Sequence, residues 1–254
     1  MNLFSSTTNM GLIVARMLTS VVLSPHMDDA VFSIGGTIGN LIIRKERVVV
    51  YNVFSVTSYV QNPKLRIAPF ATTMRYGEEI VASILMRYNR RFFPFEDNYM
   101  RKNANPAIVT SRVEKSIQKN LNLDNPVRVF APLGVGNHTD HKLLSETAMK
   151  LVENRTIRWD QLLLYEDLPY SAKPNAVEKG IQSFQNKFGV KLQPSLVDVS
   201  AQFTLKMVVS GVYRSQYDTQ DLRDLKNYAR SLSQGANQTS EDRFFERQWT
   251  IVSQ

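Results

Sequence analysis

The chain has 254 residues, a formal net charge of +8, an isoelectric point near 9.6 and no cysteine. This length suits one large α/β domain built around a single core. Without cysteine, disulfides and thiolate metal sites are excluded, so any metal must be held by His, Asp or Glu. No stretch approaches the ~20 apolar residues that a membrane span needs. We therefore expect a single domain over residues 1–254, in the reducing environment of the cytoplasm.

The positive charge is compatible with three kinds of partner: nucleic acid, an anionic membrane surface or an anionic small substrate. The basic residues are scattered, and two clusters at residues 44–47 and 87–91 are too short for a nucleic-acid-binding arm. A basic, non-enzymatic binding module for nucleic acid or anionic glycan is the alternative to an enzyme. It depends on the net charge alone, and we expect no nucleic-acid partner.

Apolar runs and helical patterns alternate along most of the chain, after a start-of-chain extension at residues 1–19. Strands are predicted at residues 21–23, 48–54, 92–95, 127–132, 162–165 and 196–199. Helices are predicted at residues 30–44, 72–88, 106–121, 142–153, 174–188, 201–216 and 218–232. The alternation predicts an α/β fold with a mostly parallel central sheet, right-handed crossovers and helices on both faces.

Three segments are predicted to depart from this alternation. Residues 55–71 are expected to form a long loop, of the kind that covers many active sites. Residues 233–240 are polar and are expected to form a second loop. The C-terminal part, about residues 217–254, is predicted to be a helical segment added to a core of about residues 20–216. Its aromatic residues, Phe244, Phe245 and Trp249, are expected to pack back on that core.

All three histidines of the chain lie in two short segments that follow predicted strands. The first segment, Ser24-Pro25-His26-Met27-Asp28-Asp29, follows the run at 21–23. The second, Asn137-His138-Thr139-Asp140-His141, follows the strand at 127–132. Open α/β sheets place their ligands at the carboxyl ends of strands, so we expect the two segments to form one site.

Within this site, His26, Asp29 and His141 offer the nitrogen and oxygen ligands of a catalytic zinc ion, which keeps a further position for water. Asp28 lies beside a ligand and would act as the general base that takes a proton from a water molecule on the metal. The structural alternative is that His26 only forms hydrogen bonds and that one of the two aspartates caps a helix.

Two residues of the second segment are expected to assist. His138 would act as the general acid that protonates the leaving amine of a cleaved amide, and its alternative role is that of a fourth metal ligand. Asp140 would hold an imidazole through its second nitrogen, or else cap the helix that begins near Lys142.

The segment Pro25-His26-Met27-Asp28-Asp29 resembles the Pro/Ala-His-Pro-Asp-Asp signature of the LmbE-like, PIG-L-type N-acetylglucosaminyl de-N-acetylases. His138-Thr139-Asp140-His141 resembles the His-Pro-Asp-His motif of the same family. Arg75 followed by Glu78 and Glu79 looks like its Arg-x-x-Glu, and Tyr213-Arg214-Ser215-Gln216 is similar to its Tyr/His-x-Ser-Gln. The resemblance covers about residues 20–216 and implies a Rossmann-like three-layer fold. It also implies the residue roles given above, with His26, Asp29 and His141 on zinc.

The resemblance further implies that Arg75, and less directly Asp97, contact hydroxyl groups of a sugar. The alternative for Arg75 is a surface ion pair with a glutamate on its own helix. Met27 and Thr139 stand where the family usually has proline, which would change loop rigidity. No residue is an obvious additional oxyanion donor, so stabilising the oxyanion would fall to His138 and the zinc.

The expected activity is removal of the acetyl group from an N-acetylglucosamine-type amino sugar or its conjugate, with one zinc ion per chain and iron(II) as the alternative metal. The same site would also suit a different amide of an amino-sugar conjugate. The basic surface suits a phosphate-bearing substrate, but a neutral glycoside is equally allowed. Residues 56–71 and 167–200 are expected to select the aglycone. The sequence leaves the aglycone and homo-oligomer formation open.

Overall fold

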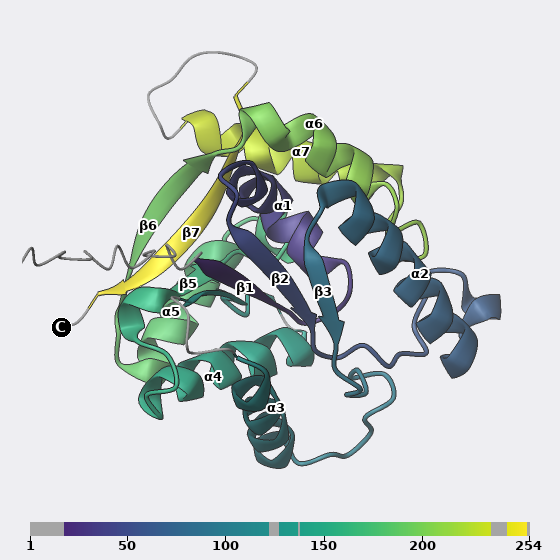
Figure 1. Cartoon of the computed structure of the whole chain (residues 1–254), viewed down its shortest axis with the longest axis horizontal. Helices are drawn as coiled ribbons and strands as arrows, with labels where there is room; N and C mark the ends of the chain where they lie inside the picture. The colour runs from purple at the N-terminus through teal and green to yellow at the C-terminus, as the bar shows by residue number, and fades with distance from the viewer. Residues whose placement is uncertain (1–17, 122–126, 137, 235–242, 253–254) are drawn as a thin grey trace, which may run out of the picture.

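The computed structural model describes residues 18–121, 127–136, 138–234 and 243–252 (Figure 1). These residues form a seven-stranded sheet in the order β3-β2-β1-β4-β5-β7-β6. The strands are β1 (Thr19–Ser24), β2 (Arg47–Asn52), β3 (Asn89–Phe92), β4 (Val127–Pro132), β5 (Leu162–Tyr165), β6 (Lys191–Asp198) and β7 (Phe245–Val252). The helices are α1 (Asp29–Ile43), α2 (Ala68–Met86), α3 (Pro106–Asn120), α4 (Thr139–Glu153), α5 (Ala176–Phe188), α6 (Ser200–Ser210) and α7 (Thr219–Gln234).

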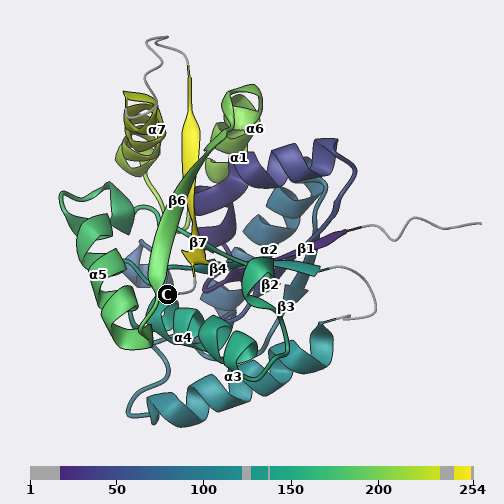
Figure 2. The ribbon, with the colours of Figure 1, turned by 90° about the vertical axis from the view of Figure 1, so that its left-hand side faces the viewer.

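The sheet lies between two layers of helices: α1, α2, α6 and α7 cover one face, and α3, α4 and α5 cover the other (Figures 1 and 2). Strands β1 to β5 are parallel, and β7 runs antiparallel to both β5 and β6. The helices bury apolar stripes against the sheet. In α4, for example, Leu144, Ala148 and Leu151 recur at helical spacing and are completely buried. The predicted α/β fold with a mostly parallel sheet is therefore confirmed.

The order of the strands determines where a ligand can bind. From β1 the chain proceeds to β2 and β3 on one side, whereas β4 and β5 extend the sheet on the other side of β1. The connections that leave β1 and β4 therefore diverge, and they leave a crevice beyond the carboxyl ends of these two strands. Both histidine segments begin at this crevice.

Several predicted boundaries needed correction. The third strand is Asn89–Phe92 rather than 92–95, because this edge strand is polar and exposed while the apolar Phe93 beyond it packs into the core. The predicted strand at 196–199 is the last part of β6, which starts at Lys191. The predicted helix at 201–216 stops at Ser210, just before Gly211.

The C-terminal prediction was only partly right. Helix α7 exists, but residues 245–252 form the strand β7 and not a helix. β7 pairs with β5 through residues 163–165 and with β6 along its whole length, so it supplies the hydrogen bonds that both strands need. The expected packing of the aromatic residues is confirmed: Phe244 stacks on Phe203 with ring centroids 3.7 Å apart, and Trp249 is buried.

Other predicted segments differ or lie outside the described residues. The expected loop at 55–71 contains a 3₁₀ turn at Pro63–Leu65 and the first residues of α2. Residues 1–17 of the predicted extension and most of the predicted loop at 233–240 lie outside the described ranges. Within those ranges, no helix has the length and apolar character that crossing a membrane requires.

Helix α1 is broken in its middle, and a buried ion pair holds the break. Ile34 has non-helical angles (φ −130°, ψ 27°). The carboxylate of Glu246, from β7, accepts hydrogen bonds from the backbone N–H groups of Gly36 (2.9 Å) and Thr37 (2.7 Å). The ammonium of Lys206, from α6, lies 2.7 Å from the same carboxylate and is completely buried. Glu246 thus acts as an N-cap for the second half of α1.

The two looser sequence motifs contact each other and join α2 to the loop after α6. Glu79 is completely buried and accepts hydrogen bonds from Asn52, Tyr88 and Tyr213, the last at 2.7 Å. Its neighbour in the sequence, Glu78, accepts hydrogen bonds from the backbone N–H of Ser215, at 2.8 Å, and from the Ser215 hydroxyl. Burial raises the pKa of Glu79 to about 7, although its three hydrogen bonds oppose the rise.

This pKa predicts a pH-dependent loss of stability. The carboxyl of Glu79 ionises near 4.5 in the unfolded chain but near 7 in the folded one, so the unfolded state loses its proton first. The free energy of unfolding should therefore fall between these pH values, by up to about 3 kcal/mol. In Glu79→Gln this component should be absent. Urea unfolding of both proteins at pH 5 and pH 7.5 measures it.

The exposed Glu153→Gln at the end of α4 is the matched control and should keep the pH dependence of the wild type. An identical pH dependence in wild type and Glu79→Gln would show that Glu79 ionises normally in the folded protein.

Candidate active site and metal centre

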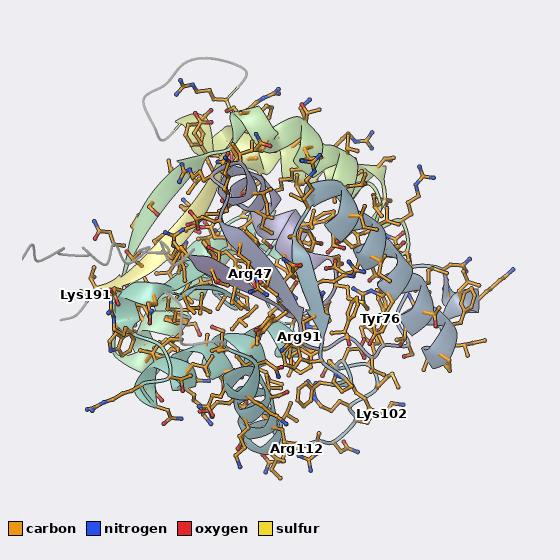
Figure 3. The ribbon with its side chains drawn as sticks, in the orientation of Figure 1. Arg47, Tyr76, Arg91, Lys102, Arg112 and Lys191 are labelled. Atoms are coloured by element: carbon orange, nitrogen blue, oxygen red, sulfur yellow. The ribbon has the colours of Figure 1, made fainter. Side chains whose placement is uncertain are left out.

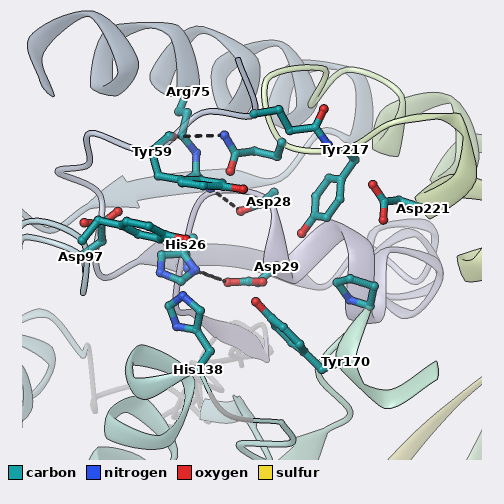
Figure 4. A pocket seen from close by; sticks show the side chains of 14 residues that line it. His26, Asp28, Asp29, Tyr59, Arg75, Asp97, His138, Tyr170, Tyr217 and Asp221 are labelled. Carbon is teal, nitrogen blue, oxygen red and sulfur yellow. Dashed lines mark hydrogen bonds and ion pairs between the residues drawn. The ribbon is translucent and has the colours of Figure 1, made fainter. Parts of the chain in front are cut away.

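The two histidine segments meet in the crevice beyond β1 and β4 (Figure 4). His26 lies in the loop after β1, and Asp29 is the first residue of α1. His138 is the N-cap of α4, and His141 lies in the first turn of that helix. The potential ligand atoms of the three histidines lie within 4.8 Å of one another, as do those of His26 with Asp28 and Asp29. The structure therefore brings all five predicted residues to one place.

The three predicted ligands converge on one carboxylate oxygen. Asp29 Oδ2 lies 3.0 Å from His26 Nδ1 and 3.3 Å from His141 Nε2. All three side chains are at most 10% exposed. Burial alone would raise the pKa of Asp29, but the charges of His141 and His26 outweigh it and hold that pKa well below its usual value.

In His26 and His141, a further carboxylate holds the ring nitrogen that does not face Asp29. Asp167 Oδ1 lies 2.7 Å from His141 Nδ1, while its Oδ2 accepts hydrogen bonds from the backbone N–H groups of Gly134 and Val135, each at 2.8 Å. Asp140 Oδ2 lies 3.0 Å from His26 Nε2. Asp140 is the second residue of α4, and His138, not Asp140, caps that helix. Carboxylates in such positions orient a metal-binding imidazole.

Sequence analysis did not identify Asp167 as a site residue. Asp167 follows the predicted strand at 162–165, and a carboxylate at one strand end carries no signal alone. Strand order supplies that signal: β5 lies beside β4, so a residue that follows β5 reaches the loop that follows β4.

Asp28 is held by a buried ion pair. Arg75 Nη2 donates a hydrogen bond to Asp28 Oδ1 at 2.6 Å, and both side chains are about 5% exposed or less. Tyr217 also lies beside Asp28, and burial, together with the negative charge of this carboxylate, holds the pKa of the phenol well above its ordinary value. The structure therefore does not show the surface pairing of Arg75 with Glu78 or Glu79, and instead places the guanidinium in the wall of the pocket.

His138 is the most exposed of the three imidazoles. Its Nδ1 accepts a hydrogen bond from the backbone N–H of Asp140 at 3.3 Å, and its ring meets His26 edge-on with centroids 4.8 Å apart. Burial and the positive charges of His26 and His141 lower the pKa of His138 to about 3. This imidazole is therefore neutral in the metal-free chain, and it lines the pocket.

These residues line a cavity of about 280 Å³. Its wall also contains four tyrosines that the sequence did not single out: Tyr59, Tyr170 and Tyr217 (Figure 4), and Tyr99. The cavity is acidic, because the carboxylates lining it are those of Asp28, Asp29, Asp97 and Asp221. Among its described lining residues, Arg75 is the one arginine or lysine, and it is paired with Asp28.

The positive charge of the chain therefore lies elsewhere. Basic side chains such as Arg47, Arg91, Arg112 and Lys191 are exposed on different elements of the surface (Figure 3). They do not gather at the mouth of the cavity, whose lining residues include none of these four.

The donor set of the site fits a divalent cation. Nitrogen and carboxylate ligands without sulfur are typical of catalytic zinc and of related divalent metals. The surroundings also stabilise positive charge: despite burial, hydrogen bonds to Asp140 and Asp29 raise the pKa of His26 to about 9. A bound cation would take the place of that proton, since metal ligands bind in their deprotonated form.

Comparisons with known proteins agree with this site. Residues 21–152, which include both histidine segments, match the family model described as PIG-L: GlcNAc-PI de-N-acetylase. The 2'-N-acetylparomamine deacetylase of Streptomyces fradiae is 26% identical over 223 residues, which are 83% of this chain and 78% of that protein. These matches confirm the resemblance that the two histidine motifs indicated.

Solved structures of deacetylases share the fold. A deacetylase of the teicoplanin biosynthesis pathway superposes with a TM-score of 0.75 at 23% identity, covering 92% of this chain and 98% of that one. The N,N'-diacetylchitobiose deacetylase of Pyrococcus horikoshii gives 0.61 at 19% identity, covering 94% and 84%. The alternative of a non-enzymatic binding module is thus wrong. The chain belongs to the PIG-L family of de-N-acetylases and is an enzyme of the hydrolase class, a deacetylase.

Proposed function

We propose that this enzyme is a zinc-dependent hydrolase that removes the N-acetyl group from an amino sugar within a larger glycoside. The observation that carries the proposal is the convergence of His26 and His141 on one oxygen of Asp29, within 3.3 Å, beside an open cavity. The names of two similar proteins support the substrate class, since one refers to 2'-N-acetylparomamine and the other to N,N'-diacetylchitobiose.

In this proposal His26, Asp29 and His141 hold the zinc ion, with Asp140 and Asp167 orienting the two imidazoles. When bound, zinc supplies Lewis acidity, which polarises an acetyl carbonyl and makes water a stronger nucleophile. The same ligands suit iron(II), and the choice between the two metals depends on geometry and availability.

The remaining residues of the site move protons. Asp28 takes a proton from the attacking water, and its ion pair with Arg75 fixes the orientation of the carboxylate. The proton that Asp28 has taken is passed through His138 to the nitrogen of the amide as the C–N bond breaks, so both side chains end the cycle as they began it. One water molecule is consumed: its hydroxyl group goes to the acetyl carbon and its proton to the nitrogen, which gives acetate and the amine of the sugar.

The acidic cavity also bears on the substrate. Neither Asp97 nor Asp221 forms an ion pair with a described residue, although both line the cavity. A phosphate group bound near them would meet uncompensated negative charge. We therefore favour a glycoside that is neutral or carries free amino groups near the acetamide, in place of the anionic substrate that the net charge of the chain had suggested.

The first experiment tests the metal and the general base together. After zinc loading and gel filtration, the wild type should retain about one zinc per chain and release acetate from N-acetylated amino sugars. Asp28→Asn should retain the zinc but lose activity by about 10²–10⁴-fold, because the proton acceptor is gone. Metal analysis and an acetate assay give the two readings.

The exposed Asp160→Asn is the matched control, because this carboxylate pairs only with Arg158 at the surface. Full deacetylation by zinc-loaded Asp28→Asn would refute the role of Asp28. A wild-type chain that retains no metal would refute the hydrolase mechanism proposed here.

A second experiment tests the carboxylate behind His141. Asp167→Asn keeps the shape of the side chain but offers a weaker acceptor to His141 Nδ1, so zinc affinity should fall by about 10–100-fold. Competition with a chelator measures the affinity, and Asp160→Asn again provides the control. An unchanged affinity would mean that the ring orientation of His141 does not depend on Asp167.

A third experiment tests the charge of the substrate. For substrates that share the same acetamido sugar, kcat/KM should be at least about tenfold higher when the aglycone carries free amines than when it carries a phosphate, a difference of about 1.4 kcal/mol. Asp221→Asn should narrow this ratio. A preference for the phosphate-bearing substrate would contradict the electrostatic argument and leave the hydrolase assignment intact.

A further inference from the structure

The hydroxyl of Tyr170 is a hydrogen-bond donor in the active-site cavity without a partner among the described residues. Tyr170 begins the 3₁₀ turn after β5, and its phenol points into the cavity toward Asp29 (Figure 4). The ring is half-buried and meets the imidazole of His141 edge-on, with centroids 5.4 Å apart and an interplanar angle of 86°. Within the described ranges, no backbone or side-chain group is hydrogen-bonded to this hydroxyl.

The other tyrosines of the cavity are placed differently. Tyr217 stacks on Phe32, with ring centroids 3.6 Å apart, and lies beside Asp28 rather than beside a proposed metal ligand. Tyr59 and Tyr99 stack on each other, with centroids 4.6 Å apart, and Tyr99 is 51% exposed. Tyr170 therefore combines a fixed ring beside a proposed metal ligand with a donor that is left free for a ligand in the cavity.

Two neighbouring features fix the position of this ring. Asp167, three residues earlier, is anchored to His141 and to the backbone at Gly134 and Val135, so the start of the turn is tied to the metal site. Gly136 supplies the space: a Cβ atom there would lie 3.0 Å from Tyr170 Cβ. Its φ of +87° also favours glycine, so the loop after β4 passes close beneath the tyrosine.

We propose that Tyr170 is a further catalytic residue, whose phenol donates a hydrogen bond to the acetyl oxygen of the substrate as negative charge develops there. The proposal rests on the proposed deacetylase reaction. A hydrogen-bond donor directed at this oxygen stabilises the transition state most when it is held in place before the reaction and shielded from water. Tyr170 would thus supply the additional oxyanion donor that no sequence motif contains.

The chemistry of the phenol agrees with a donor and not with a base. A phenol in water ionises only at about pH 10, so at neutral pH its hydroxyl carries a proton that it can donate. Because no group in the described part of the chain accepts that proton, removing the hydroxyl leaves no described partner unsatisfied and should not lower the stability of the fold.

Tyr170→Phe is the direct test. In the zinc-loaded enzyme kcat should fall by about 10²–10³-fold with little change in KM, since the interaction strengthens only in the transition state. Zinc content and the midpoint of thermal unfolding should match those of the wild type. Tyr76→Phe is the matched control, because the Tyr76 hydroxyl pairs with Ser55 outside the cavity lining, and it should keep full activity.

A second substrate separates oxyanion stabilisation from simple binding. With an N-trifluoroacetyl sugar the fluorines already stabilise the developing charge, so the loss caused by Tyr170→Phe should shrink by about tenfold or more. An equal loss for both acyl groups, or a loss confined to KM, would show that Tyr170 binds the sugar and would overturn the proposal.

Two outcomes separate this inference from the proposed function. If the wild type is active and Tyr170→Phe is equally active, the role of Tyr170 is refuted while the deacetylase assignment stands. If the zinc-loaded wild type releases no acetate from any N-acetylated amino sugar, the proposed function fails and the role of Tyr170 fails with it.

Discussion

A carboxylate oxygen buried between two imidazoles is the constraint around which this enzyme is built. Asp29 Oδ2 lies within 3.3 Å of both His26 and His141, and further carboxylates hold the outer nitrogen of each ring. Charged groups so far from water are costly unless each has a partner. The scaffold supplies those partners from the ends of several strands, so the geometry of the site depends on the order of strands in the sheet.

Sequence patterns were sufficient for the parts of the site that are local in the chain. His26, Asp28 and Asp29 lie within four residues, and their segment is recognisable because an apolar strand precedes it and a helix follows it. Asp167 and Tyr170 were not identified, because neither lies in a pattern of its own. Their roles follow from the adjacency of β4 and β5, which no local pattern specifies.

The fold was predictable to a similar extent. Buried parallel strands and amphipathic helices can be predicted from their composition and period. β3 and β7 cannot, because β3 is a polar edge strand and β7 joins the sheet from the far end of the chain. The two looser motifs show the same limit. Their residues are distant in sequence, yet Glu79 contacts Tyr213 and Glu78 contacts Ser215, so they form one contact between α2 and the loop that leads to Tyr217.

The position of β7 between β5 and β6 imposes an order on assembly of the fold. Among the described strands β6 has no other neighbour, so residues 191–198 join the sheet only after residues 245–252 or together with them. The same late strand delivers Glu246 to the break in α1, the helix that starts with Asp29. During synthesis on the ribosome, the segment with His26, Asp28 and Asp29 is made long before β7. The second half of α1 therefore lacks its cap, Glu246, until residues 245–252 have been made. Pairing over such sequence distances is slow compared with local helix formation.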